Sequence, residues 1–141
     1  MRAYLPVTPA ELAVDELPQR ELTVPEYRPD ADPETSEYEA FMQAANQSLR
    51  LLGDALPGGD REVPFTYCLR SVISLEVSEP LVDTGYSWAD VVAIHVDDPE
   101  VAELVASALA GDADSVAELE DEALMWFDPV ERTGLLATLE L

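Results

Sequence analysis

The sequence predicts an α+β fold with a single mixed or antiparallel sheet and helices mainly on one face. Two segments, 33–52 and 99–110, have helical spacing and one apolar face each, which suits packing on one side of a sheet. Other segments alternate with a period of two, as strands do. With a short helix near the N-terminus treated as an insertion, the predicted order is β-α-β-β-α-β plus a C-terminal helix, a ferredoxin-like arrangement. An α/β doubly wound parallel sheet is the alternative.

The bulk composition is that of one globular domain spanning residues 1–141. Hydrophobic residues make up 48% of the chain, enough for a core, and no apolar run approaches the length of a membrane span. The N-terminus lacks the apolar centre of a signal peptide. The single cysteine, Cys68, excludes an intrachain disulfide and suits a reducing compartment. We therefore expect a cytoplasmic protein.

Four steps to proline predict helix starts, because each proline follows a residue that caps helix N-termini well. They are Thr8-Pro9, Asp32-Pro33, Asp98-Pro99 and Asp128-Pro129. After the opening strand, the first step begins a short helix over about 9–17, and Thr8 and Glu11 have the spacing of a capping box.

The second step begins the best helix in the chain, and Gly53 is its expected end. A proline-interrupted segment at 22–27 precedes it and is predicted to be an edge strand or extended chain. The apolar stripe of the helix is predicted to pack in the core, and it consists of Tyr38, Phe41, Met42, Ala45, Leu49 and Leu52.

Residues 65–77 alternate like a half-buried antiparallel strand, with turns predicted at 58–60 and 83–85. The length favours a bulge near Arg70-Ser71. The face that carries Phe65 and Ile73 is apolar, and the opposite face is mixed.

The stretch VVAIHVDDPE, residues 91–100, contains the only histidine and a run of acids. Its β-rich first part and its Asp-Pro step predict a strand that passes directly into a helix, capped by Asp98 or alternatively by Asp97. His95 is predicted to be structural with no bound metal, because a zinc site needs further His or Cys ligands. No cofactor is predicted.

The acidic segment 112–122 is predicted to be a solvated connector with at most one helical turn capped by Ser115. A strand over 123–127 follows. The chain then ends in a helix whose apolar positions are Leu135, Leu136 and Leu139.

The charge limits the partners of the protein. Thirty acids stand against seven arginines, lysine is absent, and the formal net charge is −23. Nucleic acid and anionic membranes would repel such a surface. Solubility, salt tolerance or a basic partner would each account for it.

No catalytic constellation stands out in the sequence, since it lacks a phosphate-binding glycine loop and a supported Ser–His–Asp arrangement. We therefore predict a non-enzymatic protein-interaction or regulatory module whose partner has a basic or apolar surface. The alternatives are an acidic mimic of nucleic acid that binds a basic protein, and an enzyme that uses carboxylates. If a partner binds, Tyr86 and Trp88 are the predicted contact surface, because burial is hard to arrange in the turn that holds them.

Four stretches, in order along most of the chain, resemble a family of small acidic actinobacterial proteins of unknown function. They are MRAYLP, SLRLL, ADVVAIHVDD and EALMWFDPVE. The resemblance implies an actinobacterial, cytoplasmic origin. It carries over no catalytic residue, because the family has no assigned activity.

Overall fold

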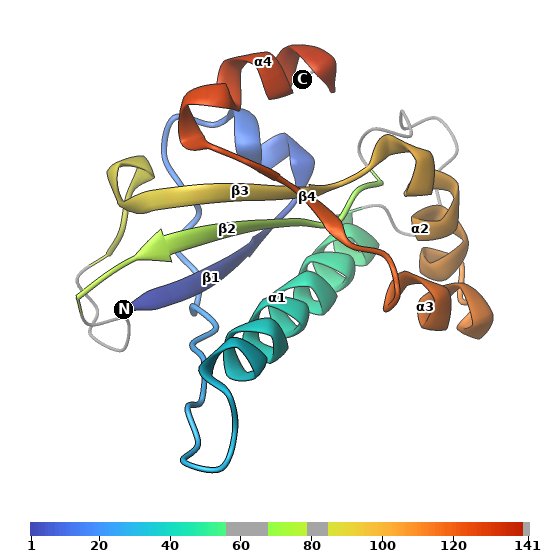
Figure 1. Ribbon diagram of the computed structural model, residues 1–141. Coiled ribbons are helices and arrows are strands. Elements are labelled where there is room, and N and C mark those ends of the chain that lie inside the picture. Colours follow the sequence, from blue (N-terminus) through green and yellow to red (C-terminus); the bar gives the residue numbers. More distant parts are fainter. Residues whose placement is uncertain (56–67, 79–84, 140–141) are drawn as a thin grey trace.

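One four-stranded antiparallel sheet organises the molecule (Figure 1). The computed structural model describes residues 1–55, 68–78 and 85–139. The strands lie in the order β1-β2-β3-β4, and each pairs antiparallel with its neighbour. Their bounds are β1 Arg2–Val7, β2 Ser71–Glu76, β3 Val91–Asp97 and β4 Leu124–Phe127. The α-helices of the described residues are α1 Pro33–Ala55, α2 Ala102–Leu109, α3 Ala113–Leu119 and α4 Arg132–Thr138. Short 3₁₀ helices are η1 Pro9–Ala13, η3 Trp88–Asp90, η4 Pro99–Val101 and η5 Pro129–Glu131.

The α+β class and the single antiparallel sheet are confirmed, but the ferredoxin-like topology is not. That topology needs β1 and β2 to be parallel with another strand between them, whereas here they pair directly and antiparallel. The reason lies in the segment between η1 and α1, which runs back along β1 and places Thr23 in an antiparallel bridge with Tyr4. This segment brings the chain back along β1 before α1 begins. Strand β2, which follows α1, therefore pairs with β1 in the antiparallel direction. The parallel doubly wound alternative is wrong.

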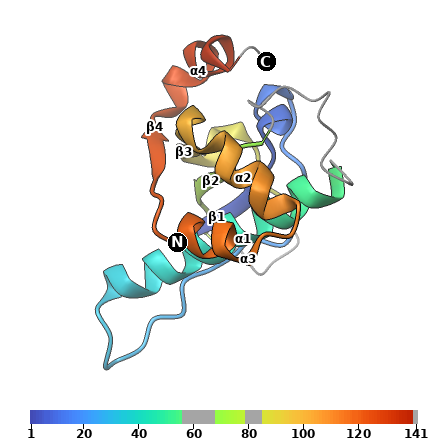
Figure 2. The same ribbon diagram turned by 90° about the vertical axis from the view of Figure 1, so that its right-hand side faces the viewer.

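Helices cover both faces of the sheet, so the expectation that they lie mainly on one face is wrong. On one face, α1 packs its alanines against Tyr4 and Val72. On the other, η1 and α4 contribute Leu12 and Leu135 to the cluster around Ile73. Helices α2 and α3 pack on each other beyond one end of the sheet (Figures 1 and 2).

Helix α1 begins where predicted, at Pro33, but it continues through Gly53 to Ala55. Within the predicted stripe, Ala45 and Leu52 are buried as expected, but Tyr38 is 60% exposed. The side chains that face the sheet are small, and they allow the helix axis to approach the strands closely. They are Ser36, Ala40, Ala44, Ala45 and Ser48.

Strand β2 is buried on both faces, not half-buried, because α1 covers the face predicted to be mixed. Val72 and Ser74 on that face are as inaccessible as Ile73 on the other. The irregularity in the ladder lies between Ser74 and Leu75, not near Arg70-Ser71. The part of the predicted strand at 65–67 and the turns predicted at 58–60 and 83–84 lie outside the described residues.

The strand-to-helix joint at 91–100 is confirmed. The Glu100 amide donates to the Asp98 carboxylate at 3.0 Å, so Asp98 is the cap. The alternative cap, Asp97, is fully buried and serves another purpose, described below. The segment 112–122 is not a connector: it contains α3, whose cap is Asp112 and not Ser115.

Candidate functional site

A pocket of about 350 Å³ opens on the α1 face of the sheet, between the helix, the strands and the segment 120–124. Its strand residues come from β1, β2, β3 and, at Leu124, β4, which the antiparallel order places side by side. The lining consists of Arg2, Tyr4, Glu37, Tyr38, Phe41, Met42, Ser74, His95, Glu120, Asp121, Glu122, Ala123 and Leu124.

Three aromatic rings form one wall of the pocket. Phe41, from α1, meets the ring of Tyr4 edge to face with centroids 5.9 Å apart. It meets the ring of His95 in the same way at 4.8 Å. Such edge-to-face contacts are favourable, so the two strand residues are held in place by the helix.

His95 is a neutral member of this wall. Its Nε2 shares a hydrogen bond of 2.8 Å with the hydroxyl of Ser74 on the neighbouring strand. Burial, followed by the charge of Arg2, lowers the pKa of His95 to about 4. The imidazole is therefore uncharged at neutral pH.

Tyr4 lines the pocket, and its hydroxyl has no hydrogen-bond partner among the described residues. The residue is only 6% exposed. Its burial raises the pKa of Tyr4, and the nearby charge of Glu37 raises it further. The phenol is thus protonated at neutral pH, and its free hydrogen-bonding capacity faces the pocket.

The pocket is acidic. Four carboxylates and one guanidinium are among its lining residues. Glu37 accepts a hydrogen bond of 3.0 Å from the hydroxyl of Tyr27 at its Oε1 atom. Arg2 is already paired with Glu76 at 3.0 Å. The remaining acids, Glu120, Asp121 and Glu122, follow one another at the end of α3.

A buried ion pair holds this acidic segment in place. The Arg70 guanidinium donates to both carboxylate oxygens of Asp97, at 2.9 and 2.8 Å, and both side chains are almost wholly inaccessible. Arg70 also donates to the backbone carbonyls of Leu119 and Glu122, at 3.0 and 3.1 Å. The pair therefore links the sheet to the segment that carries the acids of the pocket.

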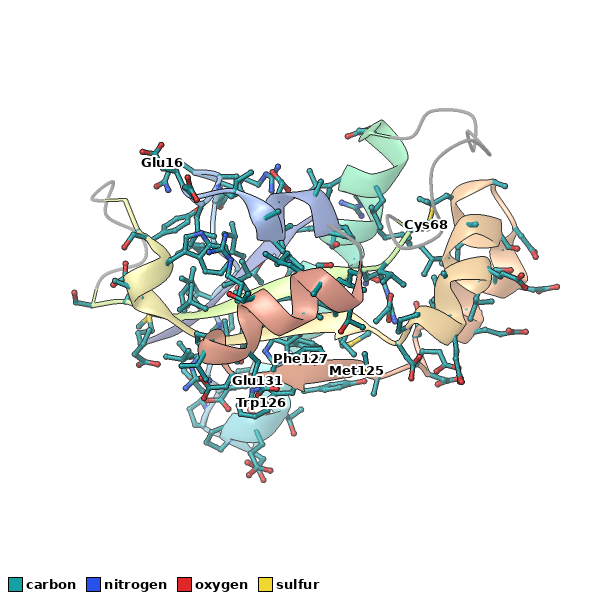
Figure 3. All side chains as sticks on the ribbon, turned by 90° about the horizontal axis from the view of Figure 1, so that it is seen from above. Glu16, Cys68, Met125, Trp126, Phe127 and Glu131 are labelled. Carbon is teal, nitrogen blue, oxygen red and sulfur yellow. The ribbon has the colours of Figure 1, made fainter. Side chains whose placement is uncertain are left out.

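Two exposed aromatic residues flank the same region. Tyr38 lines the pocket from α1, and Trp126 lies on β4 directly opposite His95. Residues opposite each other in an antiparallel pair project to the same face, so Trp126 shares the face of His95. Its side chain is 60% exposed. Figure 3 shows Met125, Trp126 and Phe127 along the edge strand of the sheet.

The predicted contact residues Tyr86 and Trp88 lie elsewhere, against the opposite core cluster. The Tyr86 hydroxyl accepts from the Arg20 amide at 2.7 Å and lies 2.8 Å from the carbonyl of Pro18. The Trp88 indole donates to the Val14 carbonyl at 3.1 Å. Both side chains are half-buried and hold the segment that precedes α1.

The arrangement favours binding over covalent chemistry. Ser74 and His95 have the separation of a nucleophile and its base, but Ser74 is 1% exposed, so a substrate would not reach its hydroxyl. A pKa of about 4 also makes His95 a weak base at neutral pH. Within residues 1–55, 68–78 and 85–139, no group of three His, Cys, Asp or Glu side chains is arranged to hold a metal ion.

The comparison with protein families confirms one part of the resemblance, a family of unknown function. Residues 1–136 match a family described as a family of unknown function, DUF6912. The chain belongs to this family. No curated protein and no solved structure matches it. In the described parts of the chain, no helix combines the length and the apolar character needed to cross a membrane.

Sequence reasoning found His95 but missed the pocket around it. The alternation of β1, β2 and β3 does put Tyr4, Ser74 and His95 on one face, but only once the strand order is known. It also missed the pairing of Arg70 with Asp97, which are 27 positions apart.

Proposed function

We propose that the protein is a non-enzymatic interaction module of the cytoplasm that binds a protein partner through this pocket. The partner surface is basic. We place the protein in actinobacteria, as the resemblance of its motifs implies.

The main support for this proposal is that the pocket has more carboxylates than cations around its aromatic wall. Four acids line the pocket, and the one guanidinium among them already has a carboxylate partner. A cation over an aromatic ring and close to carboxylates gains from both the ring quadrupole and the charges. An anion would be repelled by the same residues.

The total charge favours a basic partner over a second copy of this chain. Two molecules with a formal net charge of −23 each repel one another, and they repel nucleic acid in the same way. A basic protein is instead steered toward the pocket at a rate that falls as salt is added.

The test is calorimetric titration with a synthetic lysine-rich peptide, compared with the same peptide carrying glutamine in place of every lysine. The pocket variant combines Glu37→Gln with Asp121→Asn. The control combines Glu16→Gln with Glu103→Gln, which removes the same charge from exposed positions outside the pocket. We expect the pocket variant to weaken binding of the lysine peptide by about tenfold and the control by less than about twofold.

Binding that weakens equally in the two double variants would contradict the proposal, because overall charge and not the pocket would then attract the peptide. Equal binding of the glutamine peptide would contradict it as well.

A further inference from the structure

Resting on the proposed function, we infer that the pocket takes the ammonium group of a single lysine side chain, and that the Tyr4 hydroxyl selects an ammonium that carries N–H groups. The Tyr4 hydroxyl oxygen is thus the atom that sets the specificity of the pocket. Three features of the lining support it.

The first feature is the combination of apolar and acidic surfaces. A lysine side chain has an apolar stem and a charged tip, and the lining offers Phe41, Met42 and Leu124 beside the carboxylates. The stem can lie against the apolar residues while the tip stays near Glu37 and the aromatic wall.

The second feature favours lysine over arginine. A guanidinium binds best when its planar fork takes both oxygens of one carboxylate, whereas an ammonium is a compact charge with three rotatable donors. In this pocket Oε1 of Glu37 already accepts from Tyr27, so a fork could take both oxygens only by displacing that hydroxyl. At Glu37, the one oxygen without this bond suits an ammonium better than a fork.

The third feature is the Tyr4 hydroxyl. The Tyr4 residue is buried to more than nine-tenths and lines the pocket, and its hydroxyl has no partner among the described residues. A ligand that fills the pocket shields this hydroxyl from water, and a ligand N–H that donates to it replaces the hydrogen bond that water would otherwise make. A site that hydrogen-bonds its ligand rejects an analogue that lacks the donor. Trimethyl-lysine is such an analogue, because it keeps the charge but has no N–H on its ammonium group.

The experiment measures the affinity of the intact protein for two peptides that differ only in one central residue, lysine or trimethyl-lysine. We expect the wild type to prefer lysine by about tenfold. In Tyr4→Phe, which keeps the ring against Phe41 and removes only the hydroxyl, the two affinities should agree within about twofold. The matched control is Tyr38→Phe, which removes a hydroxyl from an exposed tyrosine of the same pocket and should keep the preference.

The outcomes separate this inference from the proposed function. If the lysine peptide binds and Glu37→Gln weakens it, but the wild type shows no preference or Tyr4→Phe retains it, the inference is wrong and the pocket proposal stands. If Glu37→Gln leaves binding unchanged, both are wrong. The thermal unfolding midpoint of Tyr4→Phe, measured alongside, confirms that the variant is folded before its affinities are compared.

Discussion

Two aromatic regions of the molecule differ in how completely their polar atoms are used. Around Tyr86 and Trp88, the phenol oxygen and the indole N–H both have protein partners, and Arg132 lies 3.9 Å from the centroid of the Trp88 ring. Around the pocket, the Tyr4 hydroxyl has no partner among the described residues, and Trp126 is mostly exposed. An aromatic side chain in a turn is thus no sign of a binding surface when its polar atoms are already bonded within the chain.

The difference follows from what each region connects. Arg132 donates to the carbonyls of Leu12 and Val14, at 2.8 and 2.6 Å, so the Trp88 region fastens α4 and the segment after η1 to the sheet. The pocket lies where α1 and the acidic segment 120–122 approach the sheet without closing over it. The first region has the contacts of a core, and the second is the region that we propose as the binding site.

The largest expected effect tests what holds the pocket together. Arg70→Met leaves the Asp97 carboxylate buried without its partner, and we expect a loss of about 3–5 kcal/mol in the free energy of unfolding. Denaturation by urea measures it. The double variant Arg70→Met, Asp97→Leu removes both charges and should recover most of that loss. Failure of the double variant to improve on the single one would contradict a charge-based origin of the effect.

The second prediction contrasts the two tryptophans. Trp88→Ala removes a buried ring face, an indole hydrogen bond and the stacking of Arg132, and should lower the free energy of unfolding by about 2–3 kcal/mol. Trp126→Ala should lower it by less than about 1 kcal/mol, because the side chain is mainly exposed. Urea denaturation measures both variants. Equal losses in the free energy of unfolding would contradict the view that Trp88 is part of the core and Trp126 is not.

The third prediction concerns pH. His95 has a pKa of about 4 when folded and about 6.5 when unfolded, so the unfolded chain binds the proton more tightly between these values. This contribution to stability is fully present above pH 6.5 and is lost as the pH falls toward 4. We expect a loss of about 2 kcal/mol between pH 7 and pH 5 from this residue. A His95→Gln variant should lack that part of the slope, and an identical slope in both proteins would show that His95 is not responsible.

The sequence predicted local structure well where the signal is local. The Asp98 cap, the strand before it and the start of α1 depend on neighbouring residues only, and all three are confirmed. The strand order was missed because it depends on how the segment around Thr23 returns along β1. The predicted stripe of α1 does not include the buried Ala40 and Ala44, because small residues give a weaker apolar signal than Tyr38.

The candidate site was harder to predict for the same reason. Tyr4, Phe41 and His95 come from three separate elements, and nothing within any one of them marks a shared wall. Tyr86 and Trp88 were predicted to contact a partner from their place in a turn, and that prediction stays open to test. Their bonds to Arg20 and Val14 span more than sixty positions, so only the folded structure reveals them.

The two tryptophans allow the central claim to be tested in one measurement. Each indole N–H gives its own signal in a two-dimensional nitrogen–proton NMR spectrum, and Trp88→Phe and Trp126→Phe variants assign the two. During titration with the lysine peptide, we predict that the Trp126 signal shifts progressively, because this residue lies opposite His95 beside the pocket. The Trp88 signal should stay in place, because its indole is bonded to Val14 within the fold. A shift of Trp88 with Trp126 unmoved would contradict the account and place the contact surface at Tyr86 and Trp88.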